Sequence, residues 1–140
     1  MVHALEEARR VLVARGELID LRPLADRWVV EVASARGSEE AGRLTDLPQG
    51  LADDAAANGA MAHGEAVRLF QRDREEHFPL HYVWDSPKEM QDYLQGEWAD
   101  FIDISEDVLQ RLRSIWAVAD ADARVRVRAK MLITRWSKVD

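Results

Sequence analysis

The sequence predicts an α/β or α+β protein, in which a small mixed β-sheet is flanked by helices. Two segments in the second half have the apolar spacing of three and four that marks amphipathic helices. A third segment, residues 124–136, alternates apolar with mostly basic side chains for much of its length, which is typical of a long strand. The chain of 140 residues contains no internal repeat and no linker, so we expect a single domain over residues 1–140.

Composition excludes several classes of protein. The net charge of −7 is the opposite of the basic surface that general nucleic-acid binding requires. The chain has no cysteine, which excludes disulfides, thiolate metal sites and cysteine nucleophiles. Its apolar runs are too short to span a membrane, and its first residues do not resemble a secretory signal. We therefore expect a cytoplasmic protein with no nucleic-acid or membrane partner.

The beginning of the chain predicts a helix followed by a buried strand. Apolar residues recur at helical spacing over residues 3–14, and Gly16 is placed to end this helix in the left-handed conformation. Residues 17–22 predict a short strand that stops at Pro23, because proline cannot donate a hydrogen bond to a strand ladder.

The middle of the chain predicts a hairpin, a long helix and an aromatic segment. Residues 26–33 and 39–47 predict two strands joined by the turn residues 34–38. Residues 51–76 are rich in alanine and charge, so they predict one long helix. Residues 78–84 are apolar and aromatic, and they predict either a short strand or an ordered loop.

Two serines mark the starts of the later helices. Ser86 is followed by Pro87 and Glu89, a capping box with proline at the first helical position. Ser105 precedes two acidic residues and then a second amphipathic segment. Both patterns therefore predict helices that begin immediately after the serine, ahead of the long strand at residues 124–136.

Residues 8–18 resemble a segment of class I S-adenosylmethionine-dependent methyltransferases, in which a helix carrying "Arg-Val-Leu-Lys-Pro-Gly-Gly" leads into the fifth strand of the sheet. The residues that match are Arg10, Val11, Leu12 and Gly16. Ala14 and Arg15 depart from the pattern, since they replace its proline and its first glycine. In that family a long seventh strand near the C-terminus inserts antiparallel between the fifth and sixth strands. The resemblance implies the same place for residues 124–136, and a fold like the C-terminal part of that Rossmann-like sheet.

The motif that binds the cofactor in that family does not occur in this sequence. The family holds S-adenosylmethionine with an acidic, glycine-rich loop after its first strand, where closely spaced glycines let the backbone approach the ligand. The seven glycines of this chain stand singly. We therefore predict no cofactor for the isolated chain, and S-adenosylmethionine only together with a complementing half. Three explanations stay open: a non-catalytic relative, one half of a split enzyme, and a coding start placed at an internal methionine of a longer enzyme.

Few residues are candidates for chemistry. The resemblance places Asp20 near the C-terminal end of a parallel strand, where a carboxylate could orient an acceptor or act as a base; the alternative is a simple pair with Arg22. A pocket beside the helix that Ser86 caps is a weaker expectation, because aromatic residues at such spacing are more often core. Its candidate ligand-binding residues are His81, Tyr82, Trp84, Asp85 and Trp98. If this pocket forms, the chain is instead an unrelated small enzyme, a third function class that stays open.

Metal and anion sites are weaker still. His77 and His81 are four residues apart, but Pro79 between them prevents a shared helical face, so no metal site is predicted. The basic side chains of the long strand would pair within the molecule or face solvent rather than bind an anion. They are Arg124, Arg126, Arg128 and Lys130.

The resemblance also implies an unpaired sheet edge. In the family the fifth strand is paired with the fourth, which has no counterpart in this chain. An unpaired edge favours association with another strand. We therefore expect a homodimer or a complementing protein chain at residues 17–22, unless the hairpin that begins near Trp28 folds over that edge.

Overall fold

The computed structural model describes residues 2–140. The chain forms two compact units. Unit 1 contains residues 2–24, 52–78 and 131–140, and unit 2 contains residues 25–51 and 79–130. Three long strands contribute residues to both units, and the expectation of a single domain over 1–140 stays a prediction.

Over residues 2–140, four helices and six strands follow one another. In order they are α1 (Val2–Val11), β1 (Glu17–Ser34), β2 (Gly37–Arg43), β3 (Thr45–Asp46), α2 (Pro48–Ala66), β4 (Phe70–Trp84), α3 (Pro87–Glu97), β5 (Ile102–Asp103), α4 (Glu106–Ala117) and β6 (Arg124–Lys138). One sheet has the order β2-β1-β6-β4, and β3 pairs with β5 in a second, two-stranded sheet. The predicted α/β or α+β class, a small sheet with flanking helices, is confirmed. The expected mixture of parallel and antiparallel pairing is not found among residues 2–140, where the strands pair antiparallel.

The last strand runs antiparallel to the first. In unit 1 the backbone N–H of Lys138 donates to the carbonyl of Gly16 over 2.9 Å. In unit 2 the Nε of Arg126 lies 2.7 Å from a carboxylate oxygen of Glu31. The late end of β6 therefore meets the early end of β1, and the early end of β6 meets the late end of β1.

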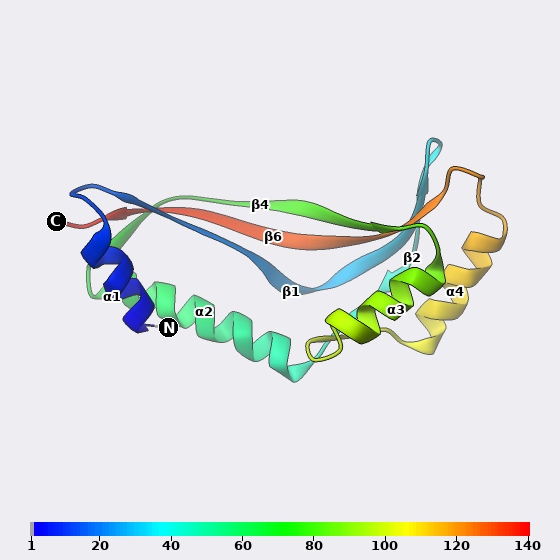
Figure 1. Ribbon diagram of the computed structural model, residues 1–140, viewed down its shortest axis with the longest axis horizontal. Helices are drawn as coiled ribbons and strands as arrows, with labels where there is room; N and C mark the ends of the chain where they lie inside the picture. The colour runs from blue at the N-terminus through cyan, green and yellow to red at the C-terminus, as the bar shows by residue number, and fades with distance from the viewer. Residues whose placement is uncertain (1) are drawn as a thin grey trace. The chain divides into compact units, whose positions relative to one another are not determined.

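The same strand also runs antiparallel to β4. Arg135 pairs with Asp73 in unit 1, and Arg124 pairs with Asp85 in unit 2. β6 thus lies between β1 and β4 and opposes the direction of both (Figure 1).

The expected stop at Pro23 is wrong, because β1 continues without a break from Glu17 to Ser34. Asp20 therefore lies near the beginning of an antiparallel strand, and its expected place near the C-terminal end of a parallel strand is also wrong. Strand β2 pairs only with residues 29–34 of β1, in the hairpin that the turn residues predict. Among residues 2–140, no strand therefore neighbours β1 at Pro23 on the side away from β6. Proline is tolerated at such a position, since no ladder hydrogen bond is lost there.

The expected helix over residues 51–76 is wrong in its last third. Helix α2 ends at Ala66. Arg68 then takes the left-handed conformation that is typical of a helix end, with φ of 59°. Leu69 then donates its N–H to the carbonyl of Gly64, and the buried Phe70 begins β4. Residues 71–77, most of them charged, are exposed on this edge strand. Their composition favours a helix, but pairing of β4 with β6 overrides that propensity.

The end of α1 also differs from the expectation. The helix ends at Val11, and the left-handed residue is Arg15, with φ of 58°, rather than Gly16. Gly16 serves a different purpose, because a Cβ there would lie 2.9 Å from the carbonyl oxygen of Val13 and 3.1 Å from Cβ of Leu12. The glycine therefore allows close packing where the chain turns into β1.

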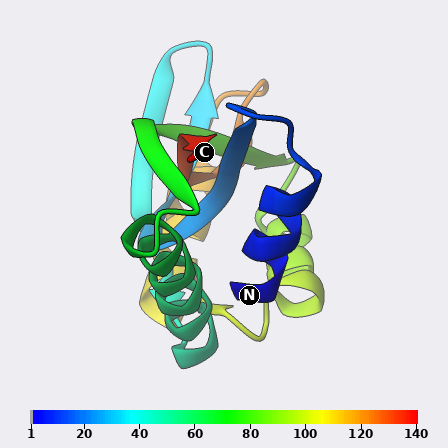
Figure 2. The same ribbon diagram turned by 90° about the vertical axis from the view of Figure 1, so that its left-hand side faces the viewer.

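The core of unit 1 lies between two helices and the strands. Helices α1 and α2 lie on the same side of these strands (Figures 1 and 2). A Cβ on Gly64 of α2 would lie 3.3 Å from Leu5 of α1, so the two helices approach closely. The buried residues of this core are Leu5, Ala60, Phe70 and Trp136.

The core of unit 2 is larger and is built on β6. Every second residue of its first half, Val125, Val127 and Ala129, is fully buried. These side chains pack with residues of α3 and α4, including Leu94 and Leu112. This strand face is the one that the alternation in the sequence predicts.

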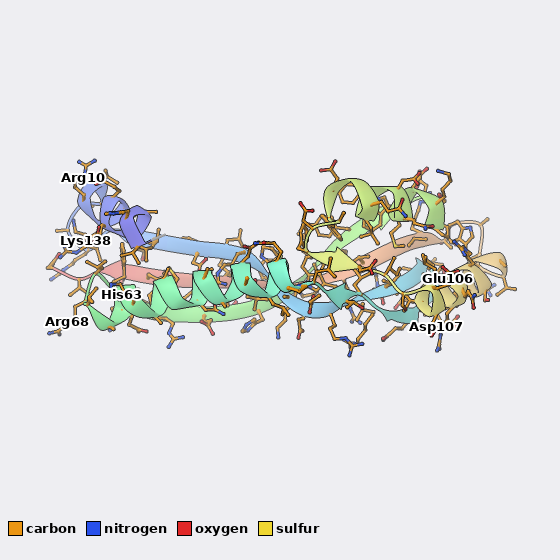
Figure 3. The ribbon with its side chains drawn as sticks, turned by 90° about the horizontal axis from the view of Figure 1, so that it is seen from below. Arg10, His63, Arg68, Glu106, Asp107 and Lys138 are labelled. Carbon is orange, nitrogen blue, oxygen red and sulfur yellow. The ribbon has the colours of Figure 1, made fainter. Side chains whose placement is uncertain are left out.

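Both predicted helix caps are confirmed. The Ser86 hydroxyl accepts from the N–H of Glu89 over 3.2 Å, and the Glu89 carboxylate accepts from the N–H of Asp85 over 3.1 Å. Ser105 caps α4 in the same way. Acidic residues 106 and 107 occupy the first turn of α4 (Figure 3), where the helix dipole favours negative charge.

Candidate functional site

Unit 1 contains a cavity of about 360 Å³, which we call the α2 cavity. One wall consists of α2 residues three and four positions apart, and the other of residues from β1, β4 and β6. The residues that matter for its chemistry are Asp20, Arg22, Glu65, Arg72, Glu75, His77, Thr134 and Trp136.

Strand alternation aims these side chains at the cavity. In residues 17–24 of β1, each even-numbered residue is half-buried and each odd-numbered residue is exposed. Asp20, Arg22 and Leu24 therefore share one face of the strand. At the late end of β6 the buried residues are again the even-numbered ones, Leu132, Thr134 and Trp136.

Asp20 and Arg22 form a largely buried ion pair at the cavity wall. The Arg22 Nε lies 3.2 Å and 3.1 Å from the two carboxylate oxygens of Asp20. Arg22 Nη2 donates to the side-chain oxygen of Asn58 on α2 over 2.7 Å. Both Asp20 oxygens are therefore engaged by the guanidinium, which is the pairing expected if Asp20 has no catalytic role.

Three residues that line the cavity each have a buried polar atom with no hydrogen-bond partner. The atoms are Arg22 Nη1, Thr134 Oγ1 and Trp136 Nε1. Thr134 is only 1% exposed and Trp136 only 4%. Among residues 2–140 only one other buried side-chain nitrogen or oxygen lacks a partner, Arg9 Nε, and Arg9 does not line the cavity. Buried polar groups are nearly always hydrogen-bonded, so this concentration needs an explanation.

Charged groups surround the same cavity. The Nη1 of Arg72 lies 3.3 Å from a carboxylate oxygen of Glu75, and its Nη2 lies 3.9 Å from one of Glu65. The guanidinium carbon of Arg72 lies 5.8 Å from the centre of the Trp136 ring. These side chains are partly exposed, so each pair contributes little to stability. With His77 neutral, three acidic and two basic side chains give the cavity lining a formal charge of −1.

The aromatic candidates lie in unit 2 and pack against one another. The Trp98 ring centre lies 4.7 Å from that of Tyr82 and 6.1 Å from that of Trp84. Trp28, Tyr93 and Phe101 also contact Trp98, which is buried. The structure brings Tyr82, Trp84 and Trp98 together as a packed cluster rather than as the walls of an open pocket.

The structure does not bring the two polar candidates into that cluster. His81 is exposed, because it alternates along β4 with the half-buried Tyr82. Asp85 is exposed as well, and its carboxylate lies 2.8 Å from Arg124. Within residues 2–140, no three histidine, aspartate or glutamate side chains are grouped so as to hold a metal ion.

Sequence reasoning missed Thr134 and Trp136 and assigned Arg22 only as a partner for Asp20. One signal was available: Thr134 is a polar residue in a strand segment that is apolar on both faces. The position of Thr134 beside residues of α2 and β1 depends on contacts between segments distant in sequence, which no local pattern specifies.

Comparison of the chain with protein-family models, curated proteins and solved structures found no match. In the part of the chain that the structure describes, no helix is both long and apolar enough to cross a membrane.

Proposed function

We propose that this chain is a methyltransferase-like protein that does not catalyse methyl transfer by itself. The observation that supports this most directly is the strand order β1-β6-β4. The resemblance at residues 8–18 identifies β1 with the family's fifth strand, and the family's last strand inserts antiparallel beside it. Strand β6 lies between β1 and β4 and is antiparallel to both, which is the arrangement that the proposal requires (Figure 1).

Two further features support the absence of catalysis. The sequence has no closely spaced glycines of the kind that cradle the cofactor. Asp20, the one candidate for a catalytic base, is held by Arg22 through both oxygens. A cytoplasmic location without a nucleic-acid partner belongs to the same proposal, on the grounds of the net charge and of the family resemblance.

Isothermal titration calorimetry with S-adenosylmethionine and S-adenosylhomocysteine tests the proposal. The isolated chain is expected to release no binding heat with either molecule, whereas an intact class I methyltransferase under the same conditions provides the positive control. Micromolar binding of either molecule to the isolated chain would overturn the proposal.

A second candidate is the substrate-side half of a split methyltransferase. It is favoured by the edge of β1 at residues 17–23, which has β6 on one side and no strand of residues 2–140 on the other. The resemblance places the family's fourth strand at this edge. A second copy of the chain is the other occupant that we propose for the edge.

Reconstitution distinguishes the two candidates. A separately expressed cofactor-binding half would be mixed with this chain, and transfer of a labelled methyl group would be measured. Transfer by the mixture but by neither chain alone supports the split enzyme. No transfer, together with no association of the two chains in sedimentation velocity, supports the non-catalytic relative.

A further inference from the structure

We propose that the α2 cavity binds a small molecule carrying both an amine and a carbonyl or carboxylate oxygen, the chemistry of an amino acid or its amide. This inference concerns unit 1 alone and does not depend on the relationship to methyltransferases.

The unpartnered atoms of the lining residues require acceptor oxygens on the ligand. Arg22 Nη1 and Trp136 Nε1 only donate hydrogen bonds, and the Thr134 hydroxyl donates or accepts. A ligand that satisfies all three therefore presents acceptor oxygens. Bulk water does not serve them, because each atom is closed to solvent. A ligand oxygen therefore reaches them only after neighbouring groups move, and this movement is part of the proposal.

The charge of the cavity lining favours a positive group on the ligand. The positive charge of Arg22 is already balanced by Asp20, and Arg72 lies between Glu65 and Glu75. A simple anion would add to a lining whose formal charge is already −1. A positive group on the ligand, placed toward Glu65 and Glu75, removes this cost. The occupant that fits both requirements is a zwitterion or a cation with an acceptor oxygen.

The volume and the apolar residues of the cavity suit a small ligand with a carbon skeleton. A cavity of about 360 Å³ is at the lower end of the range for small-molecule sites. Leu24 and Leu132 on the strand wall and Met61 on the α2 wall contribute apolar surface to the cavity. The carbon skeleton of a small ligand therefore has matching surface between its two polar ends.

Chemical shifts of the Trp136 indole N–H test the assignment directly. The resonance is identified in a proton–nitrogen correlation spectrum as the indole signal absent from Trp136→Phe. The probes are glycine, leucine and phenylalanine, each compared with its amide, its deaminated acid and its decarboxylated amine. We expect a saturable shift from at least one amino acid or amide, with the corresponding acid and amine binding at least about tenfold more weakly, the loss expected for an unmade charged hydrogen bond.

Two results would overturn the inference: no saturable shift with any of these probes, or a deaminated acid that binds as tightly as its amino acid. Thr134→Val provides an independent measurement, because it removes the hydroxyl and keeps the shape. The variant is expected to bind the probe about tenfold more weakly while its thermal midpoint without ligand stays the same or rises, since an unpartnered buried hydroxyl is lost.

The chain offers a matched control for this variant. Its only other threonine, Thr45, is exposed in β3 of unit 2 and does not line the cavity. Thr45→Val should leave the affinity for the probe unchanged. Equal affinity of wild type and Thr134→Val would overturn the assignment of Thr134 to the site.

Discussion

At the scale of single residues, three of the four basic side chains that the sequence places on one face of β6 form ion pairs within the molecule. Arg124 pairs with Asp85, Arg126 with Glu31 and Lys130 with Asp26. The pairing within the molecule that the sequence predicts is therefore present for these three side chains. The pairs differ in burial, and burial decides how much each contributes to stability.

The Glu31–Arg126 pair is the one that we expect to matter for stability. Glu31 is 3% exposed, and its carboxylate lies 2.7 Å from Arg126. Arg126→Met leaves that carboxylate buried without its partner and should lower the free energy of unfolding by about 3 kcal/mol, the lower end for buried pairs because the Arg126 side chain is partly exposed. Urea unfolding measures the loss. Lys130→Met is the control on the same strand, and its exposed pair should cost under about 1 kcal/mol. Equal losses would contradict this account.

Gly42 combines backbone strain with a steric conflict. Its φ is 156°, and a Cβ there would lie 2.7 Å from Cγ2 of Val108 on α4. Val108 is β-branched and cannot easily rotate away. Gly42→Ala should therefore destabilise unit 2 by about 2–3 kcal/mol.

Gly37 provides the matched control for that variant. It also has a positive φ, of 130°, but nothing lies within 4 Å of its Cβ position. Gly37→Ala should cost only the backbone strain, about 1 kcal/mol. Thermal unfolding of both variants separates strain from contact. A loss at Gly37 as large as that at Gly42 would show that the Val108 contact is unimportant.

At the scale of elements, local signals predicted helix starts better than strand lengths. Ser86 and Ser105 determine their helices through contacts three residues away, so the sequence contains all of the information. The end of α2 and the start of β4 depend instead on the burial of Phe70 and on pairing with β6. A charged segment such as residues 71–77 therefore has helical composition and still forms a strand.

Two glycines in α2 predict opposite outcomes of one substitution. Gly59 has nothing within 4 Å of its Cβ position, so Gly59→Ala should raise the free energy of unfolding by about 0.5–1 kcal/mol through helix propensity. Gly64 is buried, and a Cβ there would meet Leu5 at 3.3 Å. Gly64→Ala should gain less or lose stability, because Leu5 must shift. Urea unfolding of both variants tests the difference, and an equal gain would show that the contact with α1 is loose.

At the scale of the whole molecule, the α2 cavity could not be predicted from sequence. Arg22 and Thr134 are more than a hundred positions apart in the chain, and they meet only through the pairing of β1 with β6. Local alternation does predict that Arg22 shares a face with Asp20. It does not predict which helix covers that face, or that the donors there lack partners.

The edge of β1 at residues 17–23 predicts the oligomeric state. Its odd-numbered side chains are exposed, and Ile19 and Leu21 are 51% and 55% exposed. An edge with no neighbouring strand among residues 2–140 and with exposed apolar side chains favours pairing with an identical edge around a two-fold axis. We expect the purified protein to be a dimer in light scattering at micromolar concentration, and Leu21→Lys to convert it to a monomer. Val118→Lys, at an exposed apolar residue of unit 2, should leave the dimer intact. A monomeric wild-type protein, or a dimer that Leu21→Lys leaves unchanged, would exclude this edge as the interface.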